Sequence, residues 1–296
     1  MFIDIHSHAF RKHPPFVVQF CTPDQLLRRY DELGIERGAS LPIVSPEIYL
    51  PQSNEEVLEI VEQHPDRFLP FCNVDPRALT NSPDAPLDKV LQYYKDLGCK
   101  GLGEVMCNLP VMHPLVQNLF KHAEAVGLPV TYDGSDQLSG DFGLYDDPGL
   151  PQLEHTLQKF PNLIILGHGP TFWNEIGKLE TPAERGAVFR PDGQQVMRFP
   201  SGPLQEEGVM PKLMRRYPNL YGDLSDIYAI ARDPDYGAQF LTEFQDRLRF
   251  GTDICFFEHE IVHGKLLRDW CEQGRISDTV FNKLARENAI KLLGLK

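Results

Sequence analysis

The sequence contains no apolar run long enough to cross a bilayer, and no basic stretch followed by an apolar one near its start. These two absences predict a protein that is neither embedded in a membrane nor exported, so we expect it in the cytoplasm. The six cysteines form no CxxC pair, which predicts reduced, buried thiols rather than a disulfide framework.

Basic residues are scarce: 29 lysines and arginines stand against 42 acidic residues, which gives a formal net charge of -13. This balance argues against nucleic acid as a partner, because phosphate binding needs a basic face. It does not exclude a small anionic substrate, since a metal ion and a few arginines can dominate one pocket. With 42% hydrophobic residues, the 296-residue chain can form a large core.

Short apolar segments with the pattern of strands alternate with amphipathic segments that carry helix start and stop signals. The expected strands are the first eight residues and residues 37–43, 68–74, 99–106, 128–133, 163–168, 220–224 and 248–253. The expected helices are residues 22–33, 53–65, 87–97, 115–126, 150–160, 208–217, 238–244 and 277–293. Thr22 and Ser53 are the predicted N-caps of the first two helices.

Eight alternations of strand and helix predict a parallel sheet that closes into a (β/α)8 TIM barrel, in one domain spanning residues 1–296. A doubly wound open sheet is the alternative, but the Gly-rich turn that usually follows its first strand is absent. Residues 135–149 and 170–203 are too long for plain connections. Because both follow strands, we expect them to form a lid over the C-terminal face of the barrel.

Polar side chains stand at or near the C-terminal ends of the expected strands, where barrel enzymes place their chemistry. His6 and His8 alternate with Ile3 and Ile5, which puts both imidazoles on one side of the first strand. The later strands add Glu104, Asp133, His168, Asp223 and Asp253. Nitrogen and oxygen donors without thiolate suit Zn²⁺, with Mn²⁺ or Fe²⁺ as alternatives.

Each of these residues also has a purely structural interpretation. Glu104 could pair with Lys100, and Asp133 could begin an Asp-Gly turn. Asp253 could be a turn or cap residue, and Asp223 could cap Ser225 or pair with an arginine. His13, His64, His122 and His155 suit solvated positions, whereas the sequence leaves His113, His259 and His263 open.

The chemistry follows from the donor set. A bound Zn²⁺ ion lowers the pKa of its water to about 7, and Asp253 could accept the proton from that water. His168 could stabilise the substrate oxygen that becomes negative. These roles describe the hydrolysis of an amide, lactone or ester, although the same site could also carry out a non-oxidative decarboxylation.

The order of several motifs resembles the amidohydrolase superfamily, and within it the amidohydrolase-related (amidohydrolase 2) branch of metal-dependent hydrolases and decarboxylases. The motifs are Ile-Asp-Ile-His-Ser-His at residues 3–8, Gly-Leu-Gly-Glu-Val at 101–105, Leu-Gly-His-Gly-Pro at 166–170 and Arg-Phe-Gly-Thr-Asp at 249–253. The resemblance covers nearly the whole chain. It implies that His6 and His8 are metal ligands, that Asp253 is a ligand and acid–base group, and that His168 binds metal or polarises substrate.

The chain departs from this pattern on the fifth strand, where the family usually has a histidine ligand and this sequence has Asp133. Either Asp133 is an oxygen ligand, or Glu104 takes that role, or the metal is held weakly. No lysine stands at the end of the fourth strand, where it could form a carbamylated bridge, since Lys100 begins that strand. We therefore expect one metal ion rather than two.

For the substrate we expect a small molecule bearing a carboxylate, with contacts from Trp173, Arg185, Arg190 and Arg232 in or near the long loops. A decarboxylase is the alternative function, and a barrel that has lost catalysis and only binds a ligand is a further one. Barrels of this branch often pair, so a homodimer is a further expectation.

Overall fold

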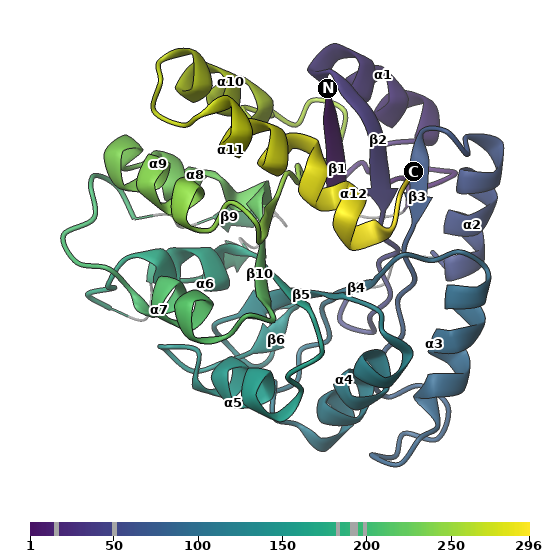
Figure 1. Cartoon of the computed structure of the whole chain (residues 1–296). Helices are drawn as coiled ribbons and strands as arrows, with labels where there is room; N and C mark the ends of the chain where they lie inside the picture. The colour runs from purple at the N-terminus through teal and green to yellow at the C-terminus, as the bar shows by residue number, and fades with distance from the viewer. Residues whose placement is uncertain (15–17, 49–51, 182–183, 190–194, 198–199) are drawn as a thin grey trace.

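Eight parallel strands form the centre of the molecule in the computed structural model, which describes all residues except 15–17, 49–51, 182–183, 190–194 and 198–199 (Figure 1). They are β1 (Phe2–Ser7), β2 (Ile35–Ser40), β3 (Phe68–Pro70), β4 (Leu102–Val105), β5 (Val130–Ser135), β7 (Ile165–His168), β10 (Leu220–Asp223) and β11 (Leu248–Arg249). Each expected strand is present. The eighth is shorter than predicted and ends at Arg249 instead of residue 253.

The strands close into a barrel. One run pairs β1, β2 and β3, and a second pairs β4, β5, β7, β10 and β11, all in parallel. Two isolated parallel bridges join the runs, Cys72 to Leu102 between β3 and β4, and Ser7 to Ile254 between β1 and the residues after β11. The (β/α)8 barrel predicted from the alternating pattern is therefore confirmed.

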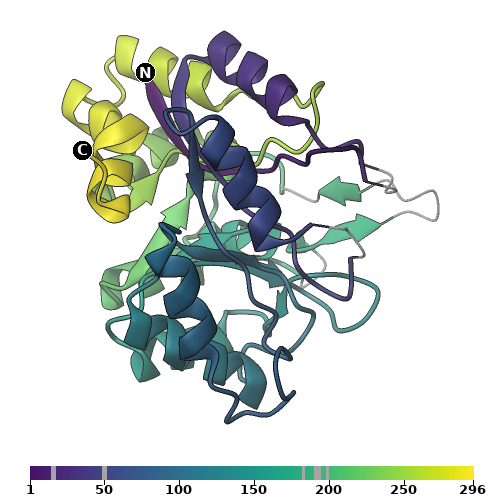
Figure 2. The same ribbon diagram turned by 90° about the vertical axis from the view of Figure 1, so that its right-hand side faces the viewer.

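Helices cover the outside of the barrel, as Figures 1 and 2 show. They are α1 (Pro23–Leu33), α2 (Asn54–Gln63), α3 (Leu87–Asp96), α4 (Pro114–Val126), α5 (Pro151–Lys159), α7 (Val209–Arg216), α9 (Pro234–Glu243) and α10 (His263–Glu272). The C-terminal part consists of α11 (Asp278–Asn282), the π-helical turn η4 (Lys283–Glu287) and α12 (Asn288–Leu293). Thr22 and Ser53 are the N-caps of α1 and α2, as predicted, and Thr22 forms a capping box with Gln25.

The structure adds elements that the sequence pattern did not reveal. Helix α10 was not predicted, and the expected helix over residues 277–293 contains the π-helical turn. The segment 135–149 includes β6 (Leu144–Tyr145). The segment 170–203 includes α6 (Pro170–Trp173), η1 (Asn174–Ile176), β8 (Ala187–Phe189) and β9 (Gln195–Met197). Short turns η3 (Leu224–Asp226) and α8 (Tyr228–Ala231) follow β10.

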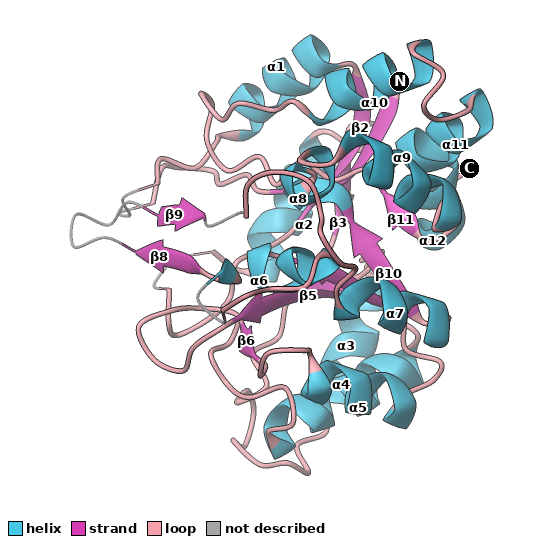
Figure 3. Ribbon diagram, turned by 90° about the vertical axis from the view of Figure 1, so that its left-hand side faces the viewer, coloured by secondary structure: helices cyan, strands magenta, loops and turns pink. Residues whose placement is uncertain are grey.

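The antiparallel pair β8–β9 projects from one side of the barrel (Figure 3). It belongs to one of the two long segments that we expected to act as a lid, and this role stays a prediction. Apolar residues of β1, β2, β3 and β7 pack with α12, so the two ends of the chain lie side by side at the barrel (Figure 1). Among the described residues, no helix combines the length and the apolar character needed to span a membrane.

Candidate metal centre

Side chains from three distant parts of the chain meet at the C-terminal end of the barrel. His6 lies in β1 and His8 directly follows it, Glu104 lies in β4, and Asp253 follows β11. The Nε2 atoms of His6 and His8 are 3.1 Å apart, and each is 3.4 Å from Glu104 Oε2. Asp253 Oδ1 lies 3.2 Å from His8 Nε2 and 3.7 Å from His6 Nε2. Four of the five residues predicted as possible ligands thus converge on one small volume.

These separations match the edges of a coordination tetrahedron. Zinc bonds to nitrogen and oxygen of about 2.0–2.1 Å require ligand atoms about 3.3–3.4 Å apart. Five of the six separations among the four donor atoms run from 3.1 to 3.7 Å. The residues therefore fit a single divalent ion of zinc size without rearrangement.

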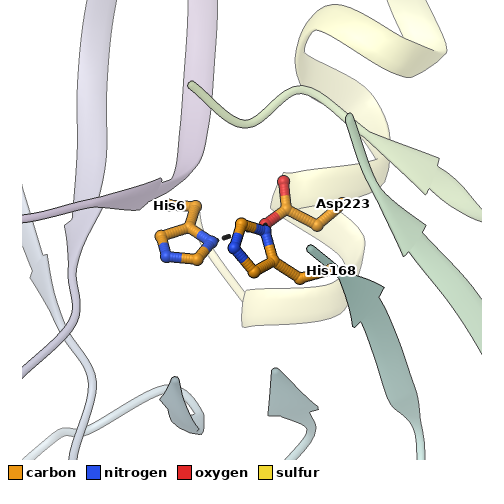
Figure 4. Close-up of side chains that lie close together, drawn as sticks. All are labelled: His6, His168 and Asp223. Atoms are coloured by element: carbon orange, nitrogen blue, oxygen red, sulfur yellow. Dashed lines mark hydrogen bonds and ion pairs between the residues drawn. The ribbon is translucent and has the colours of Figure 1, made fainter. Parts of the chain in front are cut away.

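Hydrogen bonds on the far side of each ring fix how the two histidines present their nitrogens. His8 Nδ1 lies 2.9 Å from the carbonyl oxygen of Leu41, which can only accept, so Nδ1 must carry a proton. His6 Nδ1 lies 2.6 Å from Asp223 Oδ2, a carboxylate oxygen (Figure 4). Such outer partners are typical of metal-binding histidines, because they set the tautomer and the ring orientation.

The consequence is that two Nε2 lone pairs face each other. Since both Nδ1 atoms donate outward, neutral His6 and His8 would place two acceptors 3.1 Å apart in a buried site. Only a proton or a cation between them relieves this repulsion. Burial and His168 lower the pKa of His6, but Asp223 and Glu104 outweigh them and raise it to about 10, so a proton fills the gap without metal.

Asp253 is the most accessible of the four donors. Its side chain is 29% exposed, whereas His6 and His8 are almost fully buried. Its backbone has a φ of 50°, in the left-handed region, and its N–H donates to the carbonyl of His6. Although burial raises the pKa of Asp253, the hydrogen bond from His8 and the neighbouring histidines lower it to about 2, so the carboxylate is ionised at neutral pH.

His168, Glu104 and Asp133 form an adjacent group. His168, the last residue of β7, places Nε2 3.3 Å from Glu104 Oε1, while its Nδ1 lies 2.8 Å from Ser225 Oγ and 3.2 Å from Asp223 Oδ2. One carboxylate oxygen of Asp133, in β5, lies within 4.8 Å of donor atoms of both. Burial and the charge of Glu104 raise the pKa of Asp133 well above its usual range.

The expected substrate contacts lie elsewhere. Trp173 is fully buried in the core, where its indole N–H donates to the carbonyl of Asp223, so it presents no surface to a substrate. Arg185 is also buried, and its guanidinium donates to the carbonyls of Asp146 and Asp147. It thereby ties the two long segments together instead of facing the metal centre.

The other two arginines give no support for a substrate contact either. Arg232 follows α8 and packs its guanidinium against Gly177, where a Cβ would lie 2.4 Å from Nη2. Arg190 lies outside the described residues. A carboxylate on the substrate therefore has no partner among the described arginines predicted to bind it.

The end of β10 makes more contacts with the site than the sequence pattern indicates. Asp223 does cap Ser225, as expected, but its second oxygen also accepts from His6 and approaches His168. Asp226, three residues on, is buried, and within the described residues its Oδ2 has no hydrogen-bond partner; burial raises its pKa to about 7. In the sequence, the two aspartates of Gly-Asp-Leu-Ser-Asp, at the end of a predicted strand, are the feature that could have indicated this role.

With the geometry established, comparison with known proteins decides the family. Residues 3–295 match the amidohydrolase family along nearly the entire chain. The chain belongs to this family. Its members are metal-dependent enzymes, which agrees with the convergent donor set. A search of curated proteins finds no match.

Solved structures support the same fold for this amidohydrolase. A probable 2-pyrone-4,6-dicarboxylic acid hydrolase from Acinetobacter baumannii, with citric acid bound, is 16% identical, with 99% of each chain covered and a TM-score of 0.61. An uncharacterised TIM-barrel protein from Bordetella bronchiseptica is 16% identical, with 99% and 98% covered and a TM-score of 0.64. A 5-carboxyvanillate decarboxylase from Sphingomonas paucimobilis is 13% identical, with 100% and 99% covered and a TM-score of 0.60. At these identities the likeness establishes the barrel and not the reaction.

Proposed function

We propose that this amidohydrolase hydrolyses an amide, lactone or ester bond of a small molecule with the help of one divalent ion, most simply Zn²⁺, held by His6, His8, Glu104 and Asp253. The tetrahedral spacing of these four donors is the observation that carries the proposal. When bound, such an ion supplies Lewis acidity and hydroxide near neutral pH.

The side chains of the centre have separate tasks. Asp253 is ionised and partly exposed, so its carboxylate accepts a proton from the attacking water and returns it to the leaving group. Although burial lowers the pKa of His168, Asp223 and Glu104 raise it well above its usual range, so both ring nitrogens carry protons. Nδ1 is held against Asp223 and Ser225, and Nε2–H can donate to the substrate oxygen that becomes negative. Asp223 keeps the ring of His6 in the orientation that presents Nε2.

The electrostatics of the centre favour hydrolysis over decarboxylation. Glu104 and Asp253 both have a lowered pKa and are ionised, so a carboxylate substrate would approach their negative charge. The predicted carboxylate on the substrate therefore depends on the metal ion or on Arg190, whereas an uncharged acyl group meets no such repulsion.

The test combines metal analysis with a substrate panel. Purified protein is reconstituted with Zn²⁺ or Mn²⁺ and assayed on lactones, amides and esters in matched pairs with and without a carboxylate, and on aromatic carboxylic acids. Reactions in ¹⁸O-labelled water should place one ¹⁸O in the product, and Asp253→Asn should lower the rate at least 100-fold. Release of CO₂ without ¹⁸O in the organic product would replace hydrolysis with decarboxylation. Failure of the protein to retain any metal would contradict both metal-dependent hydrolysis and metal-dependent decarboxylation.

A further inference from the structure

Arg249 in β11 carries a buried guanidinium that the protein leaves largely unsatisfied. The residue is 2% exposed, and within the described residues its Nε and Nη1 atoms have no hydrogen-bond partner. The guanidinium lies over the ring of Tyr221 in β10, with Cζ 4.3 Å from the ring centroid. The ring covers one face of the guanidinium, but the N–H groups point outward in the guanidinium plane and still need acceptors. Because buried polar groups are almost always satisfied, this group requires an explanation.

The guanidinium points away from the metal centre. Arg249 is in register with Asp223 of β10, yet its charged group stacks on Tyr221, two residues earlier in that strand. Tyr221 packs against the apolar cluster that joins the inside of the barrel to α12. Helix α12 also contacts β11, and its first residue, Asn288, donates to the carbonyl of Leu248. The unpartnered N–H groups therefore lie in an enclosed setting toward the N-terminal ends of the strands.

The charge of Arg249 has no counterion in the described part of the chain. The acidic group that acts on it most strongly is Asp246, whose side chain is 71% exposed and pairs with Lys283 at 2.8 Å. Arg247 adds a second positive charge nearby. Burial lowers the pKa of Arg249 to about 10, against the opposite influence of Tyr221 and Asp246, so the group stays charged at neutral pH. A buried charge is costly unless it is paired.

We propose that the guanidinium of Arg249 binds a small monovalent anion, most simply chloride, inside the N-terminal end of the barrel. One negative charge balances one guanidinium, whereas a divalent phosphate would leave a buried negative charge in excess. The apolar surroundings formed by Tyr221 and α12 also favour a compact ion over a large, strongly hydrated one. This inference goes beyond the proposed function and does not depend on it.

Thermal unfolding in matched salts tests the site in solution. The full-length protein is unfolded in sodium chloride and in sodium gluconate at equal ionic strength and rising concentration, because gluconate is too large for an enclosed site. An anion that binds only the folded protein raises the midpoint of unfolding. We expect a chloride-specific increase of about 2–4 °C that saturates with concentration. Equal midpoints in the two salts at every concentration would overturn the proposal.

Arg249→Met separates anion binding from general salt effects, because methionine keeps the apolar bulk and removes the charge. We expect this variant to lose the chloride-specific increase. In gluconate it should unfold at a temperature no lower than that of the parent protein, since no charge is left buried without a partner. A variant that keeps the increase would assign it to another group and contradict the site.

Arg247→Met is the matched control, two residues earlier in the chain. The guanidinium of Arg247 donates to the carbonyls of Met214 and Tyr217, so its charge already has partners. Its loss should lower the midpoint of unfolding in both salts and leave the chloride-specific increase in place. Loss of the increase in this control as well would mean that Arg249 is not the specific anion ligand.

Bromide provides a readout that needs no variant. In crystals grown with sodium bromide, anomalous scattering should place Br⁻ at hydrogen-bond distance from the guanidinium of Arg249. An ordered water at that position, with no anomalous signal, would show that water satisfies the N–H groups and would overturn the anion site. Neither experiment involves a substrate or the metal centre, so a negative result here leaves the proposed function untouched.

Discussion

Asp223 shows how much one side chain can do at the end of a strand. Its Oδ1 accepts from the backbone N–H of Ser225, while Oδ2 accepts from His6 Nδ1 and approaches His168 Nδ1 (Figure 4). The cap is a local contact, which the sequence can suggest. The contacts with the two rings join residues more than fifty positions apart, and only the barrel brings them together.

Replacing Asp223 by Asn should weaken metal binding about 10–100-fold without unfolding the protein. The amide N–H₂ of Asn would face His6 Nδ1 and favour the tautomer that carries its proton on Nε2, which blocks the ligand. Chelator competition measures the Zn²⁺ affinity. Asp235→Asn, on the surface of α9, is the control and should leave it unchanged. An unchanged Zn²⁺ affinity in Asp223→Asn would show that the His6 ring does not need the hydrogen bond to Asp223 in order to bind metal.

Asp226 should make the metal-free protein lose stability as the pH rises. Burial raises its pKa from 3.8 to about 7, so the folded protein holds a proton that the unfolded chain releases in this range. The free energy of unfolding should fall across that window by an amount on the order of 4 kcal/mol. Denaturant titrations of chelator-treated protein should show this slope, and Asp226→Asn should make it shallower without removing it, because burial also raises the pKa of Asp4 to about 7. An identical slope in the variant would assign the pH dependence to other groups.

At the scale of elements, glycines let neighbouring segments approach the site closely. Gly251 follows β11, where a Cβ would lie 1.9 Å from Asp223 Oδ1 at the end of β10. Gly38 in β2 lies equally close to Tyr30 of α1: a Cβ at Gly38 would be 1.9 Å from the hydroxyl oxygen of Tyr30. Gly251 therefore leaves room for Asp223 at the metal centre, and Gly38 leaves room for the packing of α1 against β2.

This pair provides a matched test of how the strand ends shape the centre. Gly251→Ala and Gly38→Ala should each destabilise the protein by about 1–3 kcal/mol through overpacking. Only Gly251→Ala should also weaken Zn²⁺ binding, because it displaces Asp223 from His6. Thermal unfolding and chelator competition measure the two effects. Equal metal affinities in the two variants would contradict the link from Gly251 through Asp223 to the ligand.

At the scale of the whole molecule, metal binding and proton binding compete for the same buried space. The pKa of His6 is raised to about 10 in the metal-free protein, and the pKa of His168 is raised well above its usual range. For His6 this adds stability to the metal-free fold that is complete below pH 6.5 and is lost as the pH rises toward 10. A metal ion must displace such protons from the ring nitrogens.

Zinc binding should therefore release at least one proton near pH 8, and the Zn²⁺ affinity should rise about tenfold per pH unit for each proton released. Calorimetry in buffers of different ionisation enthalpy counts the protons directly. His6→Ala should abolish both binding and release. Tight binding without proton release would mean that the imidazoles are already neutral and that their tautomers are set in another way.

The amino-acid sequence by itself determined the alternation of strands and helices, the N-caps at Thr22 and Ser53, and the eight-unit barrel, because these follow from local periodicity and capping. It also placed His6, His8, Glu104, Asp133, His168 and Asp253 near strand ends. The sequence could not distinguish residues that bind the metal from residues that orient them. That distinction depends on angles and distances between strands that are far apart in sequence.

Only the tertiary structure decided those relations. Barrel closure gives Asp223 its contacts with His6 and His168, and it turns the two oxygens of Glu104 toward different partners. It also buries Trp173 and Arg185, two residues whose chemistry alone suggested substrate binding. The physical reason is that a side chain's role depends on which groups satisfy its hydrogen bonds, and those groups here come from other strands and loops.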